Sequence, residues 1–71
     1  MESVPERFGR NVRAARLSRG WTQEELAGQS GLAVVQVSRI ERGKREVRLT
    51  TLVRLLAALE VSPATLLDGL V

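Results

Sequence analysis

Apolar residues along this chain recur at intervals of three and four positions, the period of an α-helix, and no segment alternates as a strand does. Gly20, Gly31, Gly43 and the Ser62-Pro63 pair interrupt this pattern and divide it into amphipathic segments. We therefore predict an all-α fold with five helices, at residues 5–19, 23–29, 34–42, 50–59 and 63–69.

Residues typical of helix ends support these bounds. Gly20 suits a left-handed position after the first helix. Thr22, with Glu25 three residues later, matches the capping box of a helix start. Ser62 is suited to cap the last helix, because Pro63 follows it at the first helical position.

The composition limits the classes of function. Seventy-one residues suffice for one domain, residues 1–71, and not for two. Hydrophobic residues make up 44% and charged residues 27%, a balance typical of a globular protein. The absence of Cys and His excludes disulfides, thiol or imidazole catalysis and the usual zinc sites, so we expect no enzyme, cofactor or metal. The longest apolar run, at residues 55–59, is too short for a membrane span, and we expect a cytoplasmic protein.

Positive charge is concentrated in one part of the chain. The formal net charge is +3, and residues 31–50 alone hold five basic and two acidic residues. Such a basic edge attracts nucleic-acid phosphates, although a solvated basic loop has the same composition. With only two aromatic residues, the chain lacks the stacking platform of a single-strand binder, so duplex DNA is the favoured partner.

Residues 23–42 have the features of two short helices that cross and are joined by a tight turn. Ala27 is small where the helices would cross, and Gly31 lies in the turn. Val37 and Ile40 are spaced to anchor the second helix in the core. Such a unit reads duplex DNA when its second helix projects a polar face into the major groove. The four residues at this spacing indicate a helix-turn-helix.

Three stretches, residues 21–27 (WTQEELA), 31–32 (GL) and 37–45 (VSRIERGKR), together resemble the helix-turn-helix family of phage repressors, which includes lambda repressor and Cro. The resemblance implies a compact five-helix, lambda-repressor-like domain that regulates transcription as a homodimer on a palindromic operator. At this length the chain is most similar to the short controller proteins of restriction–modification systems, for which RNA polymerase is a further partner. Antitoxins share the pattern, so an antitoxin-like module that neutralises another protein is the alternative function.

The predicted DNA-binding residues lie at the start of the first helix of this unit, along the second helix and in the loop after it. They are Thr22, Gln23, Val34, Val35, Gln36, Ser38, Arg39, Arg42, Lys44 and Arg45. The resemblance implies that Gln23 contacts the DNA backbone, near a helix N-terminus that also attracts phosphate, and a solvated Gln is the alternative. Arg39 is the candidate for a bidentate contact to guanine, with a phosphate contact or a surface ion pair as alternatives. Arg42 and the basic residues after it should bind phosphates.

Val34 and Val35 form an adjacent apolar pair at the exposed start of the second helix. A core does not explain the pair, because Val37 and Ile40 already occupy the inward face. Thymine methyl groups are natural apolar partners in the major groove, and partial packing against the turn is the alternative. Gln36, next to the pair, would read adenine or touch the DNA backbone.

Two further interactions are expected away from the DNA. The resemblance implies that Arg16 and Glu41 form a buried ion pair between the first and third helices. The last helix and the exposed side of the fourth carry more apolar residues than a small core needs. The residues expected in a twofold dimer interface, with simple core packing as the alternative, are Val53, Leu67, Leu70 and Val71.

The chain departs from the family pattern at three helix ends. Ala33 stands where Ser or Thr usually caps the third helix, and Val47-Arg48 replaces the usual Pro-Ser before the fourth. We expect both helices to start without a side-chain cap, at a cost of about 0.5–2 kcal/mol for the third. Glu60 stands where Gly often ends the fourth helix, and the left-handed conformation there would cost it about 1–2 kcal/mol.

Overall fold

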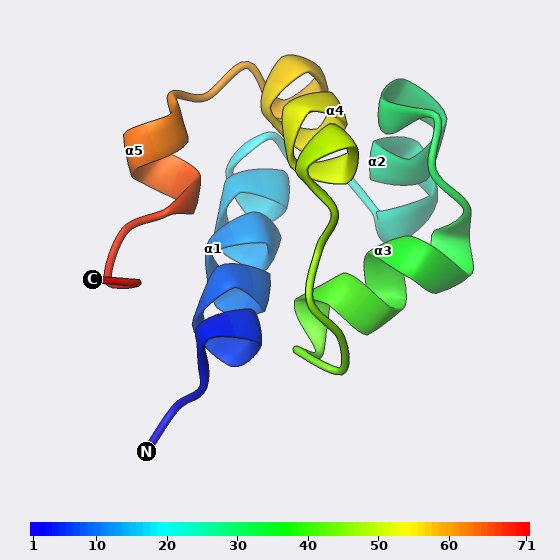
Figure 1. Ribbon diagram of the computed structural model, residues 1–71. Coiled ribbons are helices and arrows are strands. Elements are labelled where there is room, and N and C mark those ends of the chain that lie inside the picture. The colour runs from blue at the N-terminus through cyan, green and yellow to red at the C-terminus, as the bar shows by residue number, and fades with distance from the viewer.

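The computed structural model describes residues 1–71 and contains five helices and no strand (Figure 1). The helices are α1 (Val4–Ser18), α2 (Gln23–Ser30), α3 (Val34–Glu41), α4 (Leu49–Leu59) and α5 (Pro63–Leu66). Helix α1 lies in the middle of the bundle and packs against α3, α4 and α5, while α2 packs against α3 and α4. None of the five is both long enough and apolar enough to cross a membrane. The all-α prediction is confirmed.

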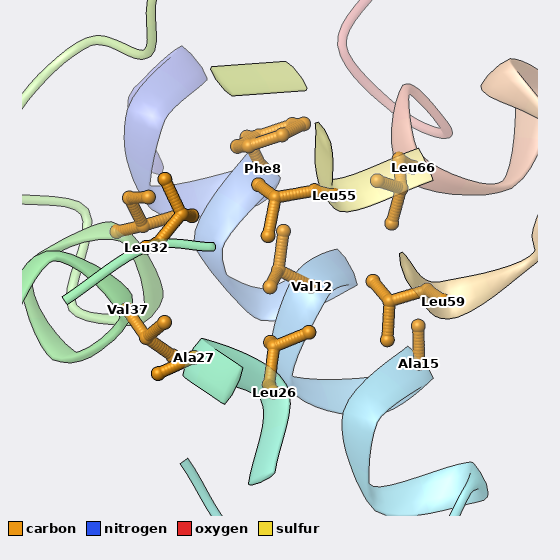
Figure 2. Close-up of a cluster of buried hydrophobic side chains, with 11 residues drawn as sticks. Phe8, Val12, Ala15, Leu26, Ala27, Leu32, Val37, Leu55, Leu59 and Leu66 are labelled. Carbon is orange, nitrogen blue, oxygen red and sulfur yellow. The ribbon is translucent and has the colours of Figure 1, made fainter. Parts of the chain in front are cut away.

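The core consists of eleven buried side chains from all five helices and the turn between α2 and α3 (Figure 2). They are Phe8, Val12, Ala15, Leu26, Ala27, Leu32, Val37, Ile40, Leu55, Leu59 and Leu66. Figure 2 shows Val12 in the centre of this cluster, where it is fully buried. The helical spacing of Phe8, Val12 and Ala15 therefore predicted the inward face of α1 correctly.

The first four helices begin and end within one residue of the predicted bounds, whereas α5 is shorter than predicted. The helix ends at Leu66 instead of residue 69, and Gly69 adopts a left-handed conformation with φ of 79°. The prediction was wrong because the carbonyl groups of this segment bond to α1 instead of continuing the helix. Asn11 Nδ2 donates to the carbonyl oxygens of Leu66 and Asp68, both at 2.8 Å.

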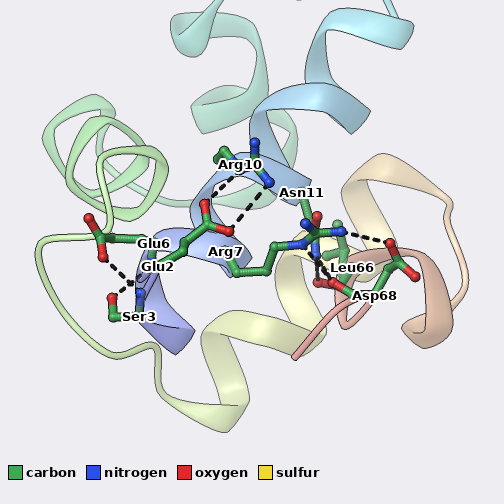
Figure 3. A network of polar contacts seen from close by, with 8 residues as sticks. All are labelled: Glu2, Ser3, Glu6, Arg7, Arg10, Asn11, Leu66 and Asp68. Carbon is green, nitrogen blue, oxygen red and sulfur yellow. Dashed lines mark hydrogen bonds and ion pairs between the residues drawn. The ribbon is translucent and has the colours of Figure 1, made fainter. Parts of the chain in front are cut away.

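Arg7 makes further hydrogen bonds to the segment that follows α5 (Figure 3). Its Nε donates to the carbonyl oxygen of Asp68 at 3.0 Å, and its Nη2 lies 2.9 Å from Asp68 Oδ2. Figure 3 shows Arg7 and Asn11 directed from α1 toward the turn that follows α5. The contacts of Arg7 and Asn11 thus hold the end of the chain against α1 and satisfy carbonyl groups that a helix end leaves free.

The helix caps follow the expectations from sequence, and one additional hydrogen bond partly replaces the missing cap of α3. Thr22 Oγ1 accepts from the Glu25 N–H at 3.1 Å, and Glu25 Oε1 accepts from the Thr22 N–H at 2.9 Å, which is the predicted capping box. Neither α3 nor α4 has a side-chain cap from the residue before it. At α3, however, Gln36 Oε1 accepts from the Ala33 N–H at 3.0 Å, so half of a capping box remains.

Glu60 is the one non-glycine residue with a positive φ, 54°, as its position after α4 predicted. Its N–H donates to the Leu56 carbonyl oxygen at 2.9 Å and closes the helix. Its carboxylate lies 2.8 Å from Arg19 Nη2. This exposed pair offsets little of the conformational cost, because surface ion pairs contribute only about 0–1 kcal/mol.

Candidate functional site

Helices α2 and α3 cross and are joined by a short turn that begins at Gly31. The φ of Gly31 is 73°, and its N–H donates to the Ala27 carbonyl oxygen at 3.0 Å. Leu32 donates to the same oxygen at 3.2 Å and buries its side chain in the core. Ala27 is itself buried, as a close approach of the two helices requires. The structure therefore has the two-helix unit that residues 23–42 predicted.

Helix α3 has one face in the core and one in solvent. Val37, Ile40 and Glu41 are buried. On the opposite side Val34 and Val35 are 40% and 56% exposed, so neither packs fully against the turn. The other residues expected to face the groove lie with them: Gln36 and Arg39 are exposed, and Ser38 is half-buried.

The ion pairs of the molecule leave seven of its eleven basic residues unpaired, and Arg13 on α1 and Arg54 on α4 are two of these seven. Four arginines of α1 and the turn after it each contact a carboxylate, in the pairs Arg7–Asp68, Arg10–Glu2, Arg16–Glu41 and Arg19–Glu60. No ion pair involves the exposed basic residues of α3 and the loop after it. These residues are Arg39, Arg42, Lys44, Arg45 and Arg48. The positive charge that remains available for a ligand therefore lies mainly beside the exposed face of α3.

Besides Gln23, whose Nε2 donates to Glu41 Oε1 at 3.1 Å, three predicted DNA-binding residues are limited by hydrogen bonds within the protein. Gln36 Oε1 already accepts from the Ala33 N–H in the α3 cap, and this bond competes with bidentate recognition of adenine, in which the same oxygen has to accept from the base. Thr22 accepts a hydrogen bond at Oγ1, which leaves its hydroxyl proton to donate. Arg42 Nε donates to the Ser38 carbonyl oxygen at 3.3 Å. The sequence predicted the bond at Thr22, as part of its capping box, but not those of Gln36 and Arg42.

Arg16 and Glu41 lie in a buried ion pair between α1 and α3, where the resemblance places them. Arg16 Nε is 2.6 Å from Glu41 Oε2, and Arg16 Nη2 is 2.9 Å from Oε1. The Glu41 carboxylate raises the pKa of Arg16 against the effect of burial. Arg16 Nη1 donates to the carbonyl oxygen of Trp21 at 2.7 Å, so the pair also fixes the turn before α2.

The residues expected in a dimer interface are divided between the surface and the core. Val53 is 57% exposed, and Leu67 and Val71 are also exposed, but Leu70 is half-buried and packs against the core. The prediction did not include Leu49, which is 75% exposed at the start of α4. Two of these residues also line an apolar hollow of about 270 Å³, whose lining residues are Val4, Pro5, Phe8, Glu46, Val47, Leu52, Leu67 and Leu70.

The family model for helix-turn-helix domains matches residues 12–66. The chain is 44% identical over 62 residues to control protein C.BamHI of Bacillus amyloliquefaciens, an alignment that covers 86% of this chain and 76% of that protein. It is 42% identical over 57 residues to a hypothetical transcription factor of Neisseria meningitidis, with 80% of this chain covered. This alignment spans only 54% of the Neisseria protein.

Among solved structures, the restriction–modification controller protein C.AhdI of Aeromonas hydrophila superposes with a TM-score of 0.84. It shares 39% sequence identity, and the match covers 87% of this chain and 94% of that one. The match to the family model, which includes both helices of the α2–α3 unit, agrees with the fold and with the exposed basic face described above. The chain therefore belongs to the helix-turn-helix family of DNA-binding transcriptional regulators.

Proposed function

We propose that this protein regulates transcription as a homodimer on a twofold-symmetric DNA operator, in the manner of a restriction–modification controller protein. The observation that carries the proposal is the distribution of free positive charge. The arginines of α1 are largely neutralised by carboxylates, whereas the exposed basic residues of α3 and its following loop are not. Such a regulator acts in the cytoplasm, and one that activates transcription would also contact RNA polymerase.

In this proposal α3 enters the major groove and its exposed residues read bases. Arg39, which is exposed and unpaired, donates to guanine O6 and N7. Val34 and Val35 contact thymine methyl groups, a role that their exposure supports. Gln36 donates through its Nε2 group, and Ser38 is placed to contact either base or backbone.

Phosphate contacts come from both sides of the reading helix. Lys44 and Arg45 follow α3 in an exposed loop, where they would bind the backbone of one strand. At the start of α2, the backbone N–H groups of Gln23 and Glu24 make no backbone hydrogen bond, because they precede the first acceptor of the helix, and would donate to a phosphate. The Thr22 hydroxyl group would donate a further hydrogen bond to this phosphate. These contacts fix the position of α3 and carry no base preference of their own.

The DNA-binding proposal predicts that selection from random duplexes will enrich a twofold-symmetric site whose affinity falls steeply with salt. Arg39→Ala should weaken binding to that site by about 1–3 kcal/mol and relax the preference at one base pair. Lys44→Ala should weaken binding to all duplex sequences alike and reduce the slope of log affinity against log salt concentration by about one. If no sequence is enriched, the operator proposal is wrong, and the antitoxin-like alternative would direct the search to a protein partner.

The dimer proposal places Val53, Leu67 and Val71 in an interface, together with Leu49. It predicts a dimer in equilibrium sedimentation at tens of micromolar protein, and a shift to monomer for Val53→Lys, because burying an unpaired ammonium group is costly. The matched control is Leu17→Lys, since Leu17 is 51% exposed on α1 and Val53 is 57% exposed on α4. A monomeric native protein, or equal dissociation by both variants, would count against this interface.

A further inference from the structure

Glu41 has a third partner besides the two donor groups of Arg16. Its Oε1 accepts both from Arg16 Nη2 at 2.9 Å and from Gln23 Nε2 at 3.1 Å. Gln23 is the first residue of α2, Glu41 is the last of α3, and Arg16 belongs to α1. The buried ion pair therefore extends, through one side-chain hydrogen bond, to a residue at the predicted DNA-binding surface.

This hydrogen bond determines which way the Gln23 amide faces. An ionised carboxylate only accepts hydrogen bonds, so Gln23 must present its nitrogen and not its oxygen to Glu41. Nε2 carries two hydrogens, and the bond to Glu41 uses one of them. The side chain makes no other hydrogen bond within the protein, which leaves one N–H donor free in a fixed orientation. A glutamine without this anchor would lose rotamer freedom on binding a ligand.

We propose that Glu41, held by Arg16, is a positioning residue for DNA binding: it orients the Gln23 amide so that the free Nε2 hydrogen donates to a phosphate oxygen of duplex DNA. The inference rests on the function proposed above, because it takes the start of α2 to face the DNA backbone. The first helix of a helix-turn-helix crosses the backbone, so a phosphate is the expected acceptor at Gln23. Glu41 acts only through Gln23, because it is itself buried.

A double-mutant cycle tests the coupling. Gln23→Ala is measured in the native protein and in the paired variant Arg16→Met with Glu41→Leu, which removes both charges together. Affinity for a fluorescein-labelled duplex of mixed sequence is followed by fluorescence anisotropy across a salt series, after circular dichroism shows that each variant is folded. Gln29→Ala is the matched control, because Gln29 is exposed on the same helix and belongs to no described network.

We expect Gln23→Ala to weaken binding about tenfold in the native protein and less than about threefold in the paired variant, where the amide is no longer oriented. The salt slope should not change, since a neutral amide releases no counterion. An equal loss in both backgrounds, or no loss in the native protein, would overturn the positioning role. A native protein that binds no duplex would instead overturn the proposed function.

A second measurement needs no variant and so does not depend on the paired variant folding. Nitrogen-15 relaxation of the side-chain amides in the free native protein should show Gln23 Nε2 to be more restricted than Gln29 Nε2. Addition of the mixed-sequence duplex should shift the Gln23 amide signals. Equal mobility of the two amides would show that Glu41 does not hold Gln23, and an unshifted Gln23 amide in bound protein would show that it makes no phosphate contact.

Discussion

Replacing Arg16 with alanine should lower the free energy of unfolding by about 3–5 kcal/mol, because it leaves the buried Glu41 carboxylate without its charged partner. The two side chains are only 9% and 3% exposed and share two short hydrogen bonds. A chain of 71 residues has a total stability of about 4–11 kcal/mol, so the substitution should remove a large fraction of it. Urea denaturation followed by far-ultraviolet circular dichroism measures the loss.

Two controls separate the buried charge from the loss of a long side chain. Arg10→Ala removes an arginine of the same helix that pairs with Glu2 at 2.7 Å on the surface, and should cost less than about 1 kcal/mol. Replacing both buried partners, Arg16→Met with Glu41→Leu, should restore much of the stability, because no uncompensated charge remains. If Arg16→Ala proved as mild as Arg10→Ala, the ion pair would not hold α1 and α3 together.

Gly9→Ala should destabilise the protein by about 3 kcal/mol, because the added methyl group has no room between α1 and α3. A Cβ atom at this position would lie 2.7 Å from the Glu41 carbonyl oxygen and would also overlap the Ile40 carbonyl oxygen. Both obstacles are backbone atoms of α3, so the helix itself has to move. Thermal and urea denaturation measure the loss of stability, and duplex binding should weaken as well, because α3 carries the residues proposed to read bases.

Gly28→Ala is the matched control for this substitution. Gly28 also lies within a helix, but a Cβ atom there would meet nothing within 4 Å. Alanine should therefore stabilise the protein by about 0.5–1 kcal/mol through its better helix propensity. Equal effects at Gly9 and Gly28 would contradict the close approach of α1 and α3.

Local patterns in the sequence were sufficient for the helices and for the inward faces of the helix-turn-helix. A helix is made of bonds between residues four apart, so periodicity and end residues such as Thr22 and Glu25 predict it directly. The burial of Val37 and Ile40 followed from the same spacing. The strain at Glu60 was also predictable, because it depends on a single residue at a helix end.

The end of the last helix, and several side-chain contacts in and around the candidate site, depended on residues that are distant in the sequence. Helix α5 ends early because Asn11 and Arg7 bind its carbonyl groups from sequence separations of 55 to 61 residues, which no local pattern reveals. In the same way, only packing decided that Arg7 and Arg19 pair with carboxylates and that Glu41 reaches Gln23. By itself, the sequence determined the first four helices, the start of the fifth and the types of side chain available to contact DNA, because these are local properties. For several of those side chains, the tertiary structure decided whether they are free to do so, because contacts such as Arg19–Glu60 and Gln23–Glu41 join residues far apart in the chain.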